Sequence, residues 1–178
     1  ALEYAPNSQT AETDMATIER DGAVLHYQVD DLTPPWIDNP STIVFCHGIG
    51  TNAEMWVNWL PVLADRHRLV RFDLRGFGRS GTFSGAAGWS LDGLADDVLA
   101  VADATGTDRF HLVGESTGGT VALYLAVRGE NRLTGITASN AAHRGGSITK
   151  VQQWHDFIAA NGVAAWSRQM MEDRFHPG

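Results

Sequence analysis

Ser116 lies in a glycine-rich turn of the form G-x-S-x-G, which runs from Gly114 to Gly118. A short apolar run precedes the turn at 110–113, and a run of small, apolar residues follows it at 117–128. A turn from strand to helix this sharp has no room for side chains at the two glycines, and it exposes the serine hydroxyl beyond the strand end. The motif therefore predicts a serine nucleophile for attack on a carbonyl. A plain glycine-rich turn is the alternative that the motif alone leaves open.

The backbone around the turn adds a second chemical group. The N–H of Thr117 lies at the start of the expected helix, where it can stabilise an oxyanion. Glu115 stands directly before the serine. Its carboxylate could repel an anionic substrate, but we expect it to form hydrogen bonds with neighbouring loops.

The elements that must position these residues follow from apolar spacing. Pro61 predicts a break near Leu60 in the helix expected at 53–64, and Ser90 is suited to cap the next helix, which Gly106 closes. Strands and helices alternate, which predicts a mostly parallel sheet with helices on both faces, an α/β fold. The expected elements are a hairpin of strands 17–20 and 23–29, strands 42–46, 68–73, 110–113 and 133–139, and helices 53–64, 91–105 and 117–128.

Composition limits the class of protein. The chain has 178 residues, of which 43% are hydrophobic and 19% charged, as in ordinary globular proteins. A net charge of −8 and the lack of any basic run argue against a nucleic-acid partner. No stretch of apolar residues is long enough for a membrane span, and no signal-peptide pattern occurs, so a cytoplasmic protein is expected. The single cysteine, Cys46, excludes an internal disulfide framework and is expected to be a small core residue.

The two ends of the chain differ from the middle. Residues 1–14 have no periodicity and are expected to be a disordered tail or an expression remnant before Met15. The core is expected to span 15–143. Residues 144–178 are expected to form the first helices of a lid, at 148–160 and 163–174. Trp154 and Trp166 of those helices are candidates to line a pocket under the lid.

Three glycine-containing motifs each follow an expected strand, and their order along the chain is distinctive. Together they resemble the α/β-hydrolase superfamily over about 17–140, and within it the branch of enol-lactonases, esterases and cofactor-free haloperoxidases. The motifs are His47-Gly48-Ile49-Gly50, the segment 73–80 that begins Asp-Leu-Arg-Gly, and Gly114-Glu-Ser116-Thr-Gly118-Gly119.

The resemblance implies a role for each matching position. Ser116 matches the nucleophile, and the backbone N–H groups of Ile49 and Thr117 match the two donors of an oxyanion hole. Gly48 and Gly50 would support that loop, since side chains there would obstruct the substrate. His47 would be structural rather than the base, because the family's order is serine, acid, histidine.

Asp73 and Arg75 could suggest a phosphate-binding loop, since a G-x-G follows them. No helix opens directly from that G-x-G, so the signal is weak. We expect both side chains to organise neighbouring turns instead.

The chain lacks an obvious general base and its orienting acid. The acids after Ser116 are Glu130, Asp156, Glu172 and Asp173, and the histidines are His143, His155 and His176. None follows directly on a strand, and the six expected strands are two fewer than the resemblance implies. We therefore expect this chain to be the N-terminal part of a longer hydrolase, whose C-terminal part, as a second fragment or a missing stretch, supplies the last strands, the acid and the histidine.

The expected function is a serine hydrolase that acts on a small ester, lactone or related carbonyl compound, without a cofactor or metal. A carbon–carbon bond hydrolase or a cofactor-free haloperoxidase-like enzyme would use the same groups. A catalytically silent binding protein of the same fold is the alternative from a different class.

Overall fold

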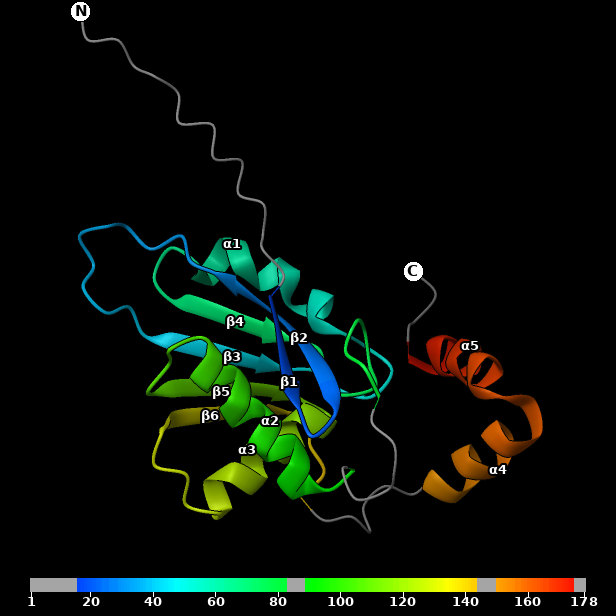
Figure 1. The fold of residues 1–178 in the computed structure, drawn as a ribbon. Coiled ribbons are helices and arrows are strands. Elements are labelled where there is room, and N and C mark those ends of the chain that lie inside the picture. Colours follow the sequence, from blue (N-terminus) through cyan, green and yellow to red (C-terminus); the bar gives the residue numbers. More distant parts are fainter. Residues whose placement is uncertain (1–15, 83–88, 144–149, 175–178) are drawn as a thin grey trace, which may run out of the picture. The chain divides into compact units, whose positions relative to one another are not determined.

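The computed structural model describes residues 16–82, 89–143 and 150–174, with side chains up to 170 (Figure 1). The tail predicted for 1–14 lies outside these ranges. The chain divides into two compact units, Ala1–Ala141 and Ala142–Gly178. Each unit is described by itself below.

The first unit is built on a six-stranded sheet in the order β1-β2-β4-β3-β5-β6. β1 pairs antiparallel with β2, and β2 pairs antiparallel with β4, whereas β4, β3, β5 and β6 run parallel. The predicted mostly parallel α/β sheet is therefore confirmed. The strands are β1 (Ala16–Arg20), β2 (Ala23–Asp30), β3 (Thr42–Cys46), β4 (Arg68–Phe72), β5 (Phe110–Glu115) and β6 (Leu133–Ser139).

Helices follow the parallel strands. The helix predicted at 53–64 is a 3₁₀ helix, η1 (Ala53–Trp59), that becomes the short α1 (Leu60–Leu63). Pro61 stands in the first turn of α1, where its missing N–H costs nothing, so the change of helix type falls at the predicted break. The other helices of this unit are α2 (Leu91–Ala104), capped by a hydrogen bond from the Gly93 N–H to the Ser90 hydroxyl, and α3 (Thr117–Val127).

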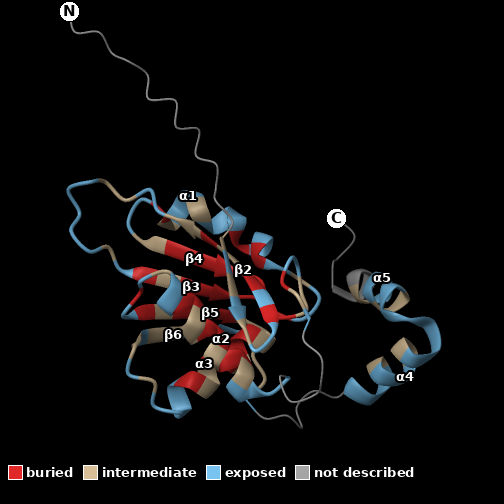
Figure 2. Cartoon of the chain, in the orientation of Figure 1, coloured by how far each residue is buried: buried red, intermediate tan, exposed pale blue. Residues whose placement is uncertain are grey.

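The sheet has a separate hydrophobic core on each face, and Figure 2 shows the buried residues concentrated in its central strands. Alternate residues of each strand point to opposite faces. Val44, Val70 and Leu112 pack against α2 and α3 in the larger core. Phe45 and Leu69 pack against η1 and α1 in the smaller one. Both faces thus carry helices, as predicted.

The second unit consists of α4 (Val151–Asn161) and α5 (Val163–Arg174), which pack against each other. Gly162 joins them with a φ of +80°, a conformation that favours glycine. The indoles of Trp154 and Trp166 meet edge to face, with ring centroids 5.9 Å apart. Among the helices in the described ranges, none has the length and apolar character needed to cross a bilayer.

Candidate active site

The carboxyl ends of β3 and β5 lie side by side, because Cys46 pairs with Gly114 in a parallel register. In the sheet, β4 lies next to β3 on one side, and β6 lies next to β5 on the opposite side, so the chain leaves β3 and β5 in opposite directions. The strand order therefore reverses between β3 and β5. Ligands of open α/β sheets bind at such a reversal, outside the carboxyl ends of the strands. The loops that follow these two strands carry His47–Gly50 and Ser116.

Ser116 occupies a sharp turn between β5 and α3, with φ +52° and ψ −115°. A positive φ is uncommon for a residue with a side chain and is a sign of backbone strain. The turn is tight at both glycines. A Cβ on Gly114 would lie 2.2 Å from the Gly118 carbonyl oxygen, and one on Gly118 would lie 2.0 Å from the Cys46 carbonyl oxygen. The structure thus has the sharp strand-to-helix turn that the motif predicts, and only glycine fits at these two positions.

The loop after β3 lies directly against the serine. A Cβ on Gly48 would be 2.8 Å from the Cβ of Ser116 and 2.3 Å from a carboxylate oxygen of Glu115. The next residue, Ile49, is 39% exposed, and Gly50 turns the chain with a φ of +78°. The fold thus brings Gly48 and Ser116 into contact, although they are 68 positions apart in the sequence.

Thr117 is the first residue of α3. The first N–H groups of a helix have no acceptor within that helix, and the helix dipole makes this end attractive to negative charge. The N–H that follows the serine is therefore placed where an oxyanion acceptor would be stabilised. Ile49 and Thr117 directly follow Gly48 and Ser116, the two residues that lie against each other.

His47 is fully buried and has bonds on both ring nitrogens. Nε2 accepts the Leu74 N–H at 2.9 Å, so the proton is on Nδ1, which donates to the Gly48 carbonyl at 2.8 Å. Burial lowers the pKa of His47, which the Gly48 bond and the nearby Asp73 only partly oppose. The neutral imidazole thus ties the loop after β3 to the end of β4 and has no nitrogen left to take a proton from Ser116.

A threonine that sequence reasoning did not single out supports the same loop. The Thr51 hydroxyl donates to the Gly48 carbonyl at 2.9 Å, beside the bond from His47. A threonine three residues after a glycine in a turn is a local signal for such a bond. The Gly48 carbonyl thus has two donors, which hold the loop after β3 in place.

Both carboxylate oxygens of Asp73 accept hydrogen bonds from nearby backbone N–H groups. One carboxylate oxygen accepts the Ala53 N–H at 2.7 Å, and the other accepts the Arg79 N–H at 2.8 Å. The Ser80 hydroxyl donates to the Asp73 carbonyl at 2.7 Å. The residue thus fastens the start of η1 and the loop after β4, in agreement with the structural role expected for it.

Arg75 is fully buried and forms an ion pair with the equally buried Asp97 of α2. Arg20 of β1 reaches the same carboxylate at 2.7 Å. Buried charges persist in proteins when they are paired in this way. The network joins the loop after β4 to α2 and to the first hairpin, and leaves Arg75 inside the fold rather than at a phosphate site. Sequence reasoning missed Asp97 and Arg20, because the three residues are far apart in the chain.

Cys46 ends β3 with no exposed surface. Burial raises the pKa of its thiol, and the nearby Asp97 adds to the effect. A thiol that resists ionisation is a poor nucleophile. Cys46 is a core residue, as the sequence suggested.

An apolar pocket of about 370 Å³ opens beside Glu115, within the first unit. Trp56 is 5% exposed, and its indole N–H has no hydrogen-bond partner among the described residues. The pocket is lined by Phe45, Met55, Trp56, Trp59, Leu63, Val113, Glu115, Thr137 and Ser139.

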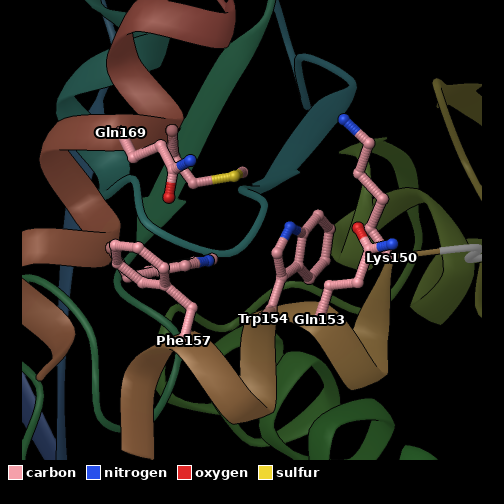
Figure 3. A pocket seen from close by; sticks show the side chains of 7 residues that line it. Lys150, Gln153, Trp154, Phe157 and Gln169 are labelled. Atoms are coloured by element: carbon pink, nitrogen blue, oxygen red, sulfur yellow. The ribbon is translucent and has the colours of Figure 1, made fainter. Parts of the chain in front are cut away.

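The second unit contains a pocket of its own, of about 140 Å³. Figure 3 shows Trp154 and Phe157 rising from α4 toward Gln169 of α5, with Lys150 at the other end. Trp154 and Trp166 both line this pocket, and the indole N–H of Trp166 has no partner in the described ranges. Its role as part of a lid stays a prediction.

Three of the acids and histidines that follow Ser116, namely Glu130, His155 and Asp156, have partners of their own. Glu130 accepts the Arg132 N–H at 3.1 Å, and His143 is exposed. His155 and Asp156 form an exposed pair at 3.4 Å. His176 lies outside the described residues. In the described ranges, no three His, Cys, Asp or Glu side chains gather as a metal site would require.

Comparison with known proteins identifies relatives of this arrangement. The chain is 31% identical over 148 residues to 3-oxoadipate enol-lactonase 1 of Acinetobacter baylyi. The alignment covers 82% of this chain and 52% of that enzyme. It is also 31% identical over 171 residues to a protein of Stutzerimonas stutzeri named as a carbamate hydrolase. That alignment covers 85% of this chain and 63% of the relative.

Solved structures give the same picture. The enol-lactonase of Burkholderia xenovorans superposes with a TM-score of 0.76 at 26% identity, over 88% of this chain and 58% of that one. The chain thus spans about half to two thirds of the length of these relatives. The sequence profile of the alpha/beta hydrolase fold matches residues 41–176. With its elbow at Ser116 and its sheet order, the chain belongs to the α/β-hydrolase fold family.

Proposed function

We propose that this chain carries the nucleophile and the oxyanion hole of a serine hydrolase. The observation that supports this most strongly is the contact between Gly48 and Ser116 at the carboxyl ends of β3 and β5. It brings a strained serine at the start of a helix against a loop whose glycine leaves room beside the serine. In the turn at Asp73, by contrast, the carboxylate accepts hydrogen bonds from backbone N–H groups of the same unit.

In the proposed reaction the Ser116 hydroxyl oxygen attacks the carbonyl carbon of the substrate. A base removes the hydroxyl proton, and the carbonyl oxygen becomes an oxyanion held by the N–H groups of Ile49 and Thr117. Each such donor typically contributes about 3 kcal/mol to the transition state. The leaving oxygen or nitrogen takes the proton from the base, and water then releases the acyl group from Ser116.

The substrate class follows from the groups around the serine and from the relatives. The neighbouring pocket is mainly apolar, so a small, moderately apolar substrate fits. An enol-lactone and a carbamate, the compounds in the relatives' names, both present a carbonyl carbon bonded to a leaving heteroatom. A lactone or ester is our leading candidate.

The acid and the histidine are proposed to come from a C-terminal part of the same protein. His47 has both nitrogens engaged, and no histidine occurs between Ser116 and Ala141. The relatives are longer than this chain. An intact-mass measurement of purified protein would show whether that part is continuous with the chain or a cleaved second polypeptide. A folded, active 19.3 kDa species without a companion would contradict the proposal.

A fluorophosphonate probe and p-nitrophenyl esters test the function in the complete protein. We expect labelling and ester hydrolysis that disappear in Ser116→Ala. Ser41→Ala is the matched control, because Ser41 is exposed and precedes β3, at the opposite end of that strand from the loop that carries Gly48. Labelling that survives in Ser116→Ala would contradict the assignment. A folded complete protein that neither labels nor hydrolyses would favour the binding protein.

A further inference from the structure

Met55 of η1 connects the apolar pocket to the loop after β3. Its side chain is 36% exposed and lines the pocket of about 370 Å³. Its sulfur also lies 3.4 Å from the Thr51 hydroxyl oxygen, within the distance of a hydrogen bond to sulfur. The same hydroxyl lies 2.9 Å from the Gly48 carbonyl oxygen. One exposed sulfur is therefore linked, through a single threonine, to the glycine that lies against Ser116.

The Thr51 hydroxyl has one proton and more than one acceptor within reach. A thioether sulfur is a weak acceptor, whereas a backbone carbonyl is a strong one. The proton therefore goes to the Gly48 carbonyl, which is also the nearer of the two. His47 donates to the same carbonyl at 2.8 Å. The second of these two bonds exists only as long as Met55 offers Thr51 nothing better.

Oxidation of the sulfur reverses this preference. Hydrogen peroxide transfers one oxygen atom to Sδ of Met55, so that the thioether is oxidised by two electrons to a sulfoxide and the peroxide is reduced to water. The sulfoxide oxygen is a polar acceptor bonded to the sulfur that Thr51 already contacts. It competes with the Gly48 carbonyl for the only proton of that hydroxyl.

Met55 is open to such a reagent, whereas the only thiol of the chain is not. Cys46 ends β3 with no exposed surface. Oxidation of sulfur by peroxide depends on access of the reagent to the sulfur atom. Beside the candidate active site, the sulfur that peroxide can reach therefore belongs to a methionine and not to the cysteine.

We propose that Met55 is a modification site, whose oxidation to the sulfoxide by hydrogen peroxide withdraws Thr51 from the Gly48 carbonyl and lowers turnover. This inference rests on the proposed function, because the loosened loop carries the Ile49 N–H of the oxyanion hole. Loss of one oxyanion donor lowers kcat about 10²- to 10³-fold, so a donor whose loop loses one of two bonds should cost less, about three- to tenfold. Methionine sulfoxide reductases reverse the oxidation, which makes the effect a switch.

Peroxide treatment of the complete protein tests the proposal. The masses of tryptic peptides show which of the four methionines in these residues has gained an oxygen atom, and hydrolysis of p-nitrophenyl esters gives kcat before and after. We expect kcat to fall about three- to tenfold as Met55 is oxidised and to recover after treatment with the reductases. Unchanged kcat in protein that is fully oxidised at Met55 overturns the proposal.

Met55→Leu and Met170→Leu form a matched pair, because each replaces a methionine by an apolar side chain of similar size. Met170 lies in α5 of the second unit. When kcat of each variant is compared with its own untreated value, only Met55→Leu should resist peroxide. Full sensitivity of Met55→Leu contradicts the proposal, whichever other methionine is oxidised.

Thr51→Val tests whether the effect passes through the hydroxyl group. Valine keeps the branched shape of threonine and removes the hydroxyl, so the Gly48 carbonyl has already lost this donor. Oxidation of Met55 should then lower kcat by less than about twofold, because the two changes act on the same bond. A full loss of kcat in oxidised Thr51→Val would assign the effect to the polar group in the pocket and overturn the proposal.

Amide hydrogen exchange separates this inference from the proposed function. Measured in Ser116→Ala, exchange at residues 48–51 reports how firmly the loop is held, without any turnover. We expect oxidation of Met55 to speed this exchange about threefold or more. Faster exchange supports the coupling of Met55 to the loop even in a protein that hydrolyses no ester, where the proposed function alone fails. Unchanged exchange overturns the coupling.

Discussion

Two glycine-containing loops at the same end of the sheet use their polar residues in opposite ways. The loop after β4 directs Asp73 inward, where the carboxylate accepts two backbone N–H groups. The turn after β5 presents Ser116, which is partly buried and lies against Gly48. Both loops are rich in glycine and polar residues. The loop after β4 satisfies its carboxylate with its own backbone groups. The turn after β5 instead places a serine hydroxyl and the N-terminus of α3 where the strand order reverses.

The contrast teaches how to separate structural from chemical residues in this fold. A buried polar group that has lost water must find partners inside the protein, and Asp73 and Arg75 have found theirs. A reactive group must stay available to a ligand. Substitutions in the first loop should therefore affect stability, and those in the second should affect turnover.

The largest expected effect is on turnover. Ser116→Ala should reduce ester hydrolysis by the complete protein about 10⁴- to 10⁶-fold, as in other serine hydrolases that lose the nucleophile. The melting temperature should not fall. Asp73→Asn is the counterpart, because it should lower the melting temperature by disturbing two hydrogen bonds and leave the turnover of the remaining folded protein intact. The distinction between the loops would be lost if Asp73→Asn abolished turnover in a protein that stays folded.

The next effect is on stability. Arg75→Met removes one partner of a buried ion pair, and such a loss costs about 3–5 kcal/mol of unfolding free energy. Because Arg20 still neutralises Asp97, we expect the lower end of that range. Urea unfolding measures it. Arg128→Met is the control, since its pair with Asp96 is solvent-exposed and should matter little. Similar losses in the two variants would contradict the role assigned to the buried network.

Gly48→Ala should affect turnover through geometry. The new methyl group would lie 2.8 Å from the Ser116 Cβ, so the loop must move and take the Ile49 N–H with it. Loss of one oxyanion donor lowers kcat about 10²- to 10³-fold, and a displaced donor should approach the lower figure. Gly129→Ala is the comparison, because Gly129 has a φ of +78° and no atom within 4 Å of its Cβ position but follows the far end of α3, so kcat should not change. Equal kcat for Gly48→Ala and the wild type would remove this loop from the oxyanion hole.

The smallest expected effect is a pH dependence of stability. Burial lowers the pKa of His47 below the usual value of about 6.5. The unfolded chain then binds the proton more readily than the folded one. The stability that depends on a neutral His47 is thus complete above about pH 6.5 and decreases as the pH falls below it. Thermal melts of His47→Asn should be flatter between pH 7 and 5 than those of the wild type, whereas exposed His155→Asn should leave the slope unchanged.

Much of the fold could be predicted because its signals are local. Short apolar runs such as 42–46 gave the buried parallel strands, and Pro61 placed the change from η1 to α1. Ser90 marked the start of α2. Gly114 and Gly118 indicated the sharp turn at Ser116 because glycine spacing reports directly on backbone crowding.

Long-range partners could not be predicted in this way. Nothing near Arg75 in the sequence points to Asp97, and the contact of Gly48 with Ser116 depends on the pairing of β3 with β5. The pocket at Trp56 also depends on where η1 lies over the sheet. The roles of the oxyanion donors and of Trp154 stay predictions until the complete protein is assayed.

The strained backbone of Ser116 has an evolutionary consequence. A serine with φ +52° costs folding energy that glycine would not, since glycine adopts positive φ freely. As long as turnover is selected, the strain is tolerated. In a lineage where selection for turnover ceases, replacement of this serine by glycine would improve stability and remove activity in a single step. Under the proposed function, position 116 is thus where a descendant of this chain could lose its chemistry and gain stability in one substitution.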